Sequence, residues 1–233
     1  MSMKIHRFIG DFNLTGKEVD ITDPENIKQI KAVLRMEVGD ELILSDGIGA
    51  EARVKIIEIS KSKMVCEVLE TKKTEESDKT VSLYLAILKK ENFELAVQKA
   101  VECGVAQIIP VITERTVKVG LNMERLEKII KEASEQSGRS ILPKLFETMN
   151  FVEALEHGKE NQEKVIFHLV DTEYLPEKNA SSVSIFVGPE GGFNESEVNL
   201  AKESGYTVAS LGTLTLRGET AAIVATYRAV QGI

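Results

Sequence analysis

The sequence predicts an α/β protein in two parts, a small N-terminal β domain and a larger C-terminal domain built on a mostly parallel sheet. Three observations lead to this fold class. Short strand-like runs joined by tight turns fill most of the range 1–73. The segment TKKTEESDKT at 71–80 contains no apolar residue, which is typical of a linker. From residue 81 onward, apolar runs of strand length alternate with segments of helical periodicity.

The N-terminal part, expected to span residues 1–73, is predicted to be a small barrel with one helix. The helix should begin at Asp23-Pro24, because Asp is a good cap and Pro suits the first helical position, and it should end at Gly39-Asp40. Tight turns that suit hairpins connect the later strands. The predicted strands lie at 4–9, 41–44, 52–59 and 63–69.

The C-terminal part, expected to span residues 74–233, alternates strands with helices, which predicts a sheet covered by helices on both faces. The predicted strands lie at 81–88, 108–112, 165–170, 183–187 and 208–211. Helices between them are indicated by the 3.6-residue spacing of apolar side chains and by caps at Asn122, Asn150 and Asn194. Pro110 indicates that the second strand has an edge position or a bend.

The composition is that of an ordinary globular chain, with 42% hydrophobic and 28% charged residues. No apolar run approaches the ~18 residues of a membrane helix, and the first residues lack the apolar core of a signal peptide. Only Cys66 and Cys103 are present, which implies no disulfide framework and fits a reducing cytoplasm. The three histidines and two cysteines lack ligand spacing, so we expect no metal site.

The net charge of −8 argues against a general polyanion-binding protein. The charge is unevenly distributed, however. Residues 1–73 hold 12 Lys and Arg against 13 Asp and Glu, whereas the remainder holds 17 against 24. An RNA-binding surface is therefore easier to place on the first part.

Two glycine-containing loops at predicted strand ends form the candidate site. The first is GPEGG at 188–192, and the second begins at Gly212 and contains Arg217 and Glu219 before a helix of small residues. Open α/β sheets usually bind ligands at the carboxyl ends of their strands, so the loops could enclose one small molecule. Such turns are often only connections. Neither GxGxxG nor GxxxxGK[ST] occurs, so nothing directly supports a dinucleotide or a nucleoside triphosphate.

GPEGGF at 188–193 and LGTLTLRGETA at 211–221 resemble the two signature motifs of the RsmE family, methyltransferases that modify N3 of a uridine in small-subunit ribosomal RNA. The resemblance extends to HRF at 6–8, VLRM-x-x-GD at 33–40, TERT at 113–116 and EQSGR at 135–139. It implies a PUA-like barrel followed by a SPOUT domain with a trefoil knot, which periodicity alone cannot predict. It also implies S-adenosylmethionine as cofactor, ribosomal RNA or the assembled small subunit as partner, and a cytoplasmic homodimer.

The resemblance also implies roles for individual residues. Arg217 is expected to stabilise negative charge on the uracil oxygens after N3 loses its proton, and Glu219 or Glu190 could accept that proton. Cofactor contacts are expected from Gly188, Pro189, Glu190, Gly191, Gly192, Leu211, Gly212, Leu216 and Arg217. RNA contacts are expected from Arg7, Arg35, Gln136 and Arg139.

Two positions depart from the family pattern. Leu214 stands where an Arg is common, and Gln29 lies where a His is often seen. These departures leave open a methyltransferase of the same superfamily with another RNA target, or an RNA-binding assembly factor without activity. A nucleotide-binding oxidoreductase is disfavoured because the glycine fingerprint is missing. The EQSGR segment also fits a plain helix end with Gly138 as its cap, and isolated arginines are often only solvated.

Overall fold

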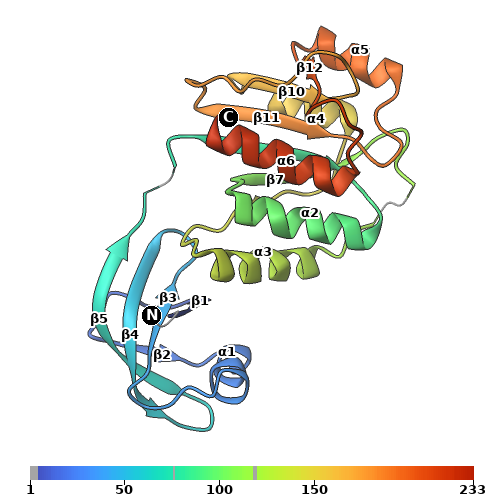
Figure 1. Ribbon diagram of the computed structural model, residues 1–233. Coiled ribbons are helices and arrows are strands. Elements are labelled where there is room, and N and C mark those ends of the chain that lie inside the picture. Colours follow the sequence, from blue (N-terminus) through green and yellow to red (C-terminus); the bar gives the residue numbers. More distant parts are fainter. Residues whose placement is uncertain (1–4, 76, 118–119) are drawn as a thin grey trace. The chain divides into compact units, whose positions relative to one another are not determined.

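The computed structural model describes residues 5–75, 77–117 and 120–233, and the chain divides into two compact units. The first unit takes in the described part of 1–76 together with 134–142, and the second takes in 77–133 and 143–233. Figure 1 shows the elements of both units along the chain. The boundary at residue 73 stays a prediction, and the return of 134–142 to the first unit is an addition that no sequence pattern indicated.

The first unit is a curved five-stranded sheet with one helical segment. Its order is β1-β3-β4-β5-β2, with β1 parallel to β3 and the other pairs antiparallel. The elements are β1 (His6–Ile9), β2 (Glu18–Ile21), α1 (Pro24–Lys28), η1 (Gln29–Val33), β3 (Glu41–Ser45), β4 (Ala50–Ile59) and β5 (Met64–Lys73). Apolar side chains from alternate strand positions bury against Ile27 and Ile30 of the helical segment. The predicted small β domain with one helix is confirmed.

Three details of the first unit differ from the prediction. The helical segment ends at Val33 and not at Gly39, because Arg35 adopts a left-handed backbone with φ 55° and the Met36 amide bonds back to the Ile30 carbonyl. The short strand β2 was not predicted, since only its two buried side chains, Val19 and Ile21, mark it in the sequence. Strand β5 also continues beyond the predicted end, because backbone pairing with β4 does not need apolar side chains.

The second unit is a parallel sheet with helices on both faces, as predicted. The strands are β6 (Thr80–Ala86), β7 (Gln107–Ile112), β8 (Lys144–Leu145), β9 (Met149–Asn150), β10 (Glu163–Phe167), β11 (Ser182–Val187) and β12 (Thr207–Ala209). Their order is β12-β10-β11-β6-β7-β8, and β9 also pairs with β7. The helices are α2 (Lys90–Cys103), α3 (Met123–Ser137), α4 (Phe151–Gly158), α5 (Glu195–Glu203) and α6 (Gly218–Gln231), and the last residues of α3, from 134 onward, belong to the first unit. The trefoil knot stays a prediction.

Strand β7 corrects the expectation for Pro110, because β7 is paired on both sides. One neighbour is β6; the other side is shared by β8, which pairs with Gln107 and Ile108, and β9, which pairs with Val111 and Ile112. The Val111 carbonyl accepts a hydrogen bond from the Ile87 amide, just after β6. Because backbone groups of successive strand residues point to opposite sides, the nitrogen of Pro110 faces the gap between β8 and β9. Pro110 has no backbone N–H, but no hydrogen bond between strands is lost at this position.

The fold brings the carboxyl ends of β6, β7, β10, β11 and β12 to one edge of the sheet, because all these strands are parallel. Aromatic packing fixes the strand beneath the first candidate loop. Tyr84 of β6 stacks on Phe186 of β11 with ring centroids 4.2 Å apart, and Phe193, just after the loop, packs on Phe151 at 5.5 Å. The loop at 188–192 is thus held between two buried anchors.

Candidate functional site

A cavity of about 680 Å³ opens at the carboxyl ends of the parallel strands. Both loops singled out in the sequence line it, as do residues that follow β6, β7 and β10. Every predicted cofactor contact is among the lining residues, from Gly188 to Gly192 in the first loop and from Leu211 to Arg217 in the second. Segments about twenty residues apart in the chain therefore share one cavity, as the position of the loops predicted. Their contact with a cofactor stays a prediction.

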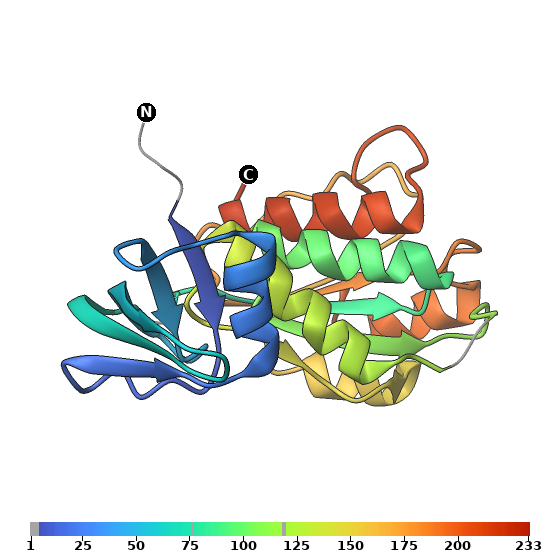
Figure 2. The ribbon, with the colours of Figure 1, turned by 90° about the horizontal axis from the view of Figure 1, so that it is seen from below.

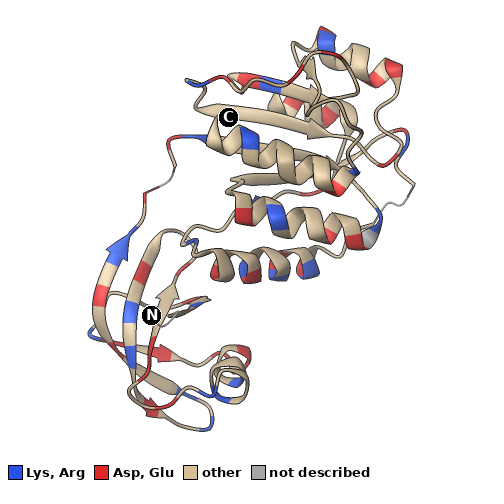
Figure 3. Ribbon diagram, in the orientation of Figure 1, with Lys and Arg blue, Asp and Glu red and all other residues tan. Residues whose placement is uncertain are grey.

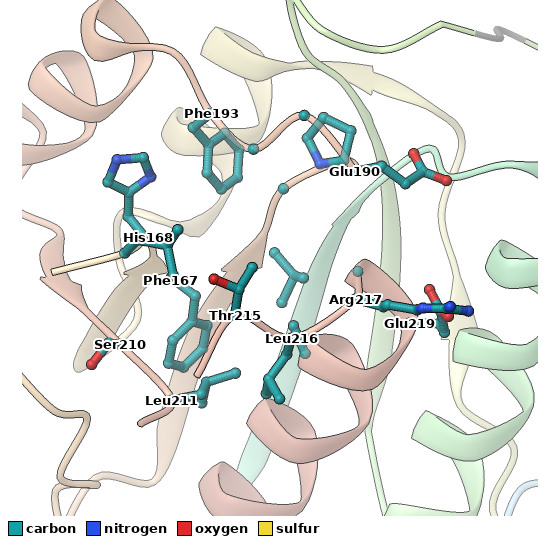
Figure 4. Close-up of a pocket in the computed structure, with 18 of the residues that line it drawn as sticks. Phe167, His168, Glu190, Phe193, Ser210, Leu211, Thr215, Leu216, Arg217 and Glu219 are labelled. Atoms are coloured by element: carbon teal, nitrogen blue, oxygen red, sulfur yellow. The ribbon is translucent and has the colours of Figure 1, made fainter. Parts of the chain in front are cut away.

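The cavity has two chemically different ends (Figure 4). At one end lie Phe167, His168 and Leu211, which present mostly ring and aliphatic surface. At the other lie Arg217, Glu219 and Glu190, all charged. Such a site suits a ligand with a flat apolar ring and a separate polar group.

The first loop, 188–192, is a tight turn whose backbone favours glycine. The Gly192 amide bonds to the Pro189 carbonyl at 2.8 Å, and Gly192 has φ 67°. A Cβ on Gly188 would lie 3.2 Å from the ring of Phe193, which is buried. The predicted cap of the following helix is confirmed, because Asn194 and Glu197 form a reciprocal capping box at the start of α5.

Glu190 links this loop to the neighbouring helix. Its Oε1 accepts a bond of 3.1 Å from the amide of Lys89, the N-cap residue of α2, whose own side chain makes no capping bond. Partial burial opposes ionisation of Glu190, but hydrogen bonds from the amide of Lys89 and from its own amide outweigh it, so its pKa is lowered. A carboxylate with a lowered pKa is a weak proton acceptor, so this geometry favours a structural task for Glu190.

The second loop, 211–217, makes few contacts that would fix its conformation. Among the described residues, no hydrogen bond or ion pair involves residues 211–216, and Leu214 is 77% exposed. Gly212 has φ 129° with open space around the position of a Cβ. The loop is anchored where α6 begins, because a Cβ on Gly218 would lie 2.8 Å from Leu88 Cδ2, and only glycine permits this approach.

Arg217 and Glu219 are polar groups that lack partners within the described part of the chain. Arg217 is exposed at the N-cap of α6 and makes no side-chain capping bond, and no hydrogen bond or ion pair of its guanidinium is found there. Glu219 is 8% exposed, and its Oε2 is buried without a hydrogen-bond partner. Buried polar atoms are almost always hydrogen-bonded, so an unsatisfied carboxylate oxygen beside a cavity indicates a site that a ligand completes.

Two of the predicted RNA-binding residues serve the interior of the first unit. Arg7 forms an ion pair with Glu51, and their side chains are only 12% and 14% exposed. Arg139 donates from Nε to the Ile141 carbonyl at 3.3 Å, and burial lowers its pKa. Gly138 takes the left-handed conformation with φ 84°, so this segment is also a regular helix end. RNA contacts by Arg7 and Arg139 stay predictions.

The other two predicted RNA-binding residues, Arg35 and Gln136, are exposed. Arg35 is the single non-glycine residue with positive φ among those described, and such backbone strain often marks functional positions. Figure 3 shows basic and acidic residues interspersed along β4 and β5, in line with the near balance of charge in 1–73. The first unit therefore offers individual basic groups on a mixed surface.

Sequence reasoning missed several lining residues, namely Lys89, Asn92, Phe167 and His168. Phe167 ends β10 and His168 follows it, whereas Lys89 and Asn92 come between the end of β6 and the first turn of α2, so the carboxyl-end rule could have found them once the strand ends were known. Within the described ranges, no group of three or more His, Cys, Asp and Glu could hold a metal ion. No helix in the same ranges is long and apolar enough to cross a membrane.

Comparison with known proteins gives consistent matches over both units. Residues 75–230 match the family model of an RNA methyltransferase domain, and residues 21–69 match that of an RNA methyltransferase PUA domain. The chain is 32% identical to the ribosomal RNA small subunit methyltransferase E of Rickettsia conorii, over 96% of this chain and 94% of the relative. The enzyme of the same name from Bacillus subtilis is 31% identical over 92% and 87%.

A solved structure shows the same fold. The ribosomal RNA small subunit methyltransferase E of Neisseria gonorrhoeae, bound to S-adenosyl methionine, is 30% identical to this chain and has a TM-score of 0.86. The similarity covers 95% of each chain. The range that matches the methyltransferase family model, 75–230, includes both loops of the cavity.

Proposed function

Because the chain belongs to the ribosomal RNA small subunit methyltransferase E family, we propose that it transfers a methyl group from S-adenosylmethionine to N3 of a uridine in small-subunit ribosomal RNA. The observation that carries the proposal is the shared cavity. Both motifs of the family resemblance line it, and it has apolar groups at one end and an unpaired Arg and Glu at the other.

The cavity suits the proposed cofactor. Its volume of about 680 Å³ is that of an ordinary small-molecule site. Phe167, Leu211 and Leu216 offer apolar surface for an adenine ring, and the bare backbone of 188–192 permits close approach of polar ring atoms. The unsatisfied Oε2 of Glu219 remains as an acceptor for the N3–H of the substrate base.

The protein's part in the reaction is to position and to stabilise charge. Bound S-adenosylmethionine would supply a methyl group activated by its sulfonium. The two loops would hold the acceptor nitrogen in line with that carbon, which by itself supplies much of the acceleration. Uridine N3 must lose its proton before it can attack, and the charge then spreads to the uracil oxygens. Arg217 is exposed, unpaired and on the cavity wall, so its guanidinium can bind these oxygens.

Glu219 is the better placed of the two carboxylates to accept the N3 proton. Its Oε2 has no partner, whereas Glu190 is hydrogen-bonded to the start of α2 and has a lowered pKa. The proton must leave N3 before the methyl group arrives, since both occupy the same in-plane position. Glu190 would then help to hold the cofactor loop.

The substrate base would enter the cavity from an unpaired or extruded nucleotide, because a stacked base cannot reach such a pocket. Arg35 and Gln136 of the first unit are the accessible candidates for backbone contacts elsewhere on the RNA. The proposal includes residues 1–73 as the RNA-binding domain and 74–233 as the catalytic domain. It also includes a homodimer that acts in the cytoplasm.

Methyl transfer from labelled S-adenosylmethionine to small subunits and to naked ribosomal RNA tests the proposal. The RNA should come from cells that lack this protein, and the expected product is one 3-methyluridine in the small-subunit RNA. Calorimetry with S-adenosylmethionine and with NAD is the matched binding experiment. Binding of NAD alone, or transfer to no RNA in any assembly state, would overturn the proposal.

A further inference from the structure

The turn that follows β7 is closed on itself. The Thr113 amide donates to Thr116 Oγ1 at 2.9 Å, and the Thr116 amide donates to the Thr113 carbonyl at 3.1 Å. The two hydroxyl oxygens lie 3.0 Å apart, and Thr113 is buried. Residues 113–116 thus form a compact turn whose two outer side chains, Glu114 and Arg115, project in defined directions.

Glu114 fastens this turn to the start of α5. Its amide donates to Oε1 of Glu197 at 2.9 Å, and its carboxylate accepts a bond from the side chain of Asn194. Glu197 is 8% exposed, and its other oxygen accepts from the Asn194 amide at 2.9 Å. The capping box of α5 is therefore shared with the turn after β7.

Arg115 fastens the same turn to the first loop of the cavity. Its Nη1 donates to the Gly191 carbonyl at 2.6 Å. The aliphatic stem lies against the same glycine, because a Cβ built on Gly191 would be 3.3 Å from Arg115 Cδ and 3.5 Å from Arg115 Cβ. The Gly192 amide already bonds within the loop, so the Arg115 bond fixes the orientation of the peptide between Gly191 and Gly192.

We propose that Arg115 is a positioning residue that holds the loop 188–192 in its cofactor-binding conformation. The proposal rests on the proposed function. Arg115 lines the cavity, but its guanidinium donates to the loop backbone, and Glu114 anchors the turn from which it projects. Removal of its bond should allow the loop to sample other conformations, and the cofactor would then bind only the remaining fraction of competent molecules.

The experiment compares Arg115→Met, which keeps the stem but loses the donors, with Arg115→Lys, which keeps the charge and one donor group. Arg125→Met is the matched control, because Arg125 is an exposed arginine of the second unit that pairs with Glu94 at 2.7 Å and does not line the cavity. Calorimetry on the full chain gives the Kd for S-adenosylmethionine. Methyl transfer to small subunits gives kcat and the KM for each substrate.

Arg115→Met should raise the cofactor Kd and KM about tenfold, the effect of one lost charge-assisted bond, and leave kcat at saturating cofactor within about twofold. Arg115→Lys should recover part of the affinity, and Arg125→Met should change neither constant. Hydrogen exchange at the Gly192 amide, which bonds to the Pro189 carbonyl, should accelerate about tenfold in Arg115→Met without any ligand present.

Three results would overturn the assignment. A lower kcat with unchanged cofactor Kd would make Arg115 a contact of the reacting groups. A raised KM for RNA alone would make it an RNA contact. Unchanged hydrogen exchange in the loop would show that Arg115 does not hold the loop in place. Failure of the wild-type chain to bind S-adenosylmethionine would remove the proposed function itself. The hydrogen-exchange measurement tests the positioning role of Arg115 independently, because it needs no cofactor.

Discussion

The two loops that share the cavity are held in opposite ways. The first, 188–192, is tied to its surroundings through Glu190, which bonds to the Lys89 amide, and through Gly191, which accepts from Arg115. In the second, 211–217, residues 211–216 make no hydrogen bond within the described part of the chain, and Leu214 is largely exposed. One wall of the site is therefore preorganised, and the other can adjust when ligands arrive.

This difference suits a reaction with two substrates of unequal size. A small cofactor gains affinity from a wall that is already in place, since no loop ordering opposes its binding. An RNA nucleotide has to enter over the same cavity, and a loop with few bonds can move to admit it. The arginine that we assign to the uracil oxygens, Arg217, lies at the end of the adjustable wall.

The largest expected effect comes from Arg217→Ala. The guanidinium has no partner to lose within the described residues, so the free energy of unfolding should change by less than about 0.5 kcal/mol. Loss of a donor to a developing anion should lower kcat by about 10²-fold to 10³-fold, with a much smaller change in cofactor Kd. Single-turnover methyl transfer and denaturant unfolding measure the two quantities. Full retention of activity would remove Arg217 from the catalytic groups.

Glycine-to-alanine changes in the two loops compare them directly. Gly192 has φ 67°, which alanine adopts at a cost of about 1–2 kcal/mol, whereas Gly212 has φ 129°, outside the regions open to L-residues. Both sites have space for a Cβ. Gly192→Ala should therefore lower stability and reduce cofactor affinity less than Gly212→Ala does, because the first loop keeps its shape. Gly212→Ala should shift the loosely held loop, so that affinity falls about tenfold at a stability cost below about 1 kcal/mol.

Unfolding by denaturant and calorimetry with S-adenosylmethionine separate these outcomes. If Gly192→Ala lost more affinity than Gly212→Ala, the first loop would be the adjustable one and the comparison would be reversed.

The sequence predicted the parts of the site that depend on local rules. The cap of α5 followed from Asn194 and Glu197, and the shared cavity followed from two glycine loops at the ends of strands that had to be parallel. The two-residue strands β8 and β9 were not predictable, because periodicity needs more residues than they contain.

Tertiary pairing decided what the sequence left open. Arg7 matched a family motif, yet its side chain is largely buried against Glu51, forty-four positions further along the chain. Glu135 likewise accepts a bond of 2.8 Å from the Ile9 amide, which helps to place 134–142 in the first unit. Neither partner lies near in sequence. A motif therefore indicated which residues matter, and only the fold indicated whether they face a ligand or the interior.

A smaller effect is expected from Leu214→Arg, which restores the residue common in the family. Leu214 is 77% exposed, so stability should change by less than about 0.5 kcal/mol. An added cation on the second loop should strengthen RNA binding a few-fold at low salt. The slope of log affinity against log salt concentration should steepen by the amount expected for about one more phosphate contact. Leu175→Arg is the matched control, since Leu175 is 78% exposed and does not line the cavity. Equal gains in RNA affinity for both variants would show a non-specific charge effect.

The smallest effect is expected from Glu190→Gln in the tied loop. The folded-state pKa of Glu190 is lowered, so its carboxylate adds stability above the ordinary value of about 4.5, and this contribution is lost as the pH falls through the folded pKa. Glu190 is exposed, and solvent screening limits the contribution to a few tenths of a kcal/mol. Unfolding by denaturant should show the variant slightly less stable than the wild type at about pH 7 and equal to it at about pH 3.

Because Glu219 carries the proton-accepting role in our proposal, kcat should stay within about twofold in Glu190→Gln and fall in Glu219→Gln. A reversed order of kcat values would move the proton acceptor to the tied loop and leave Glu219 as the structural carboxylate.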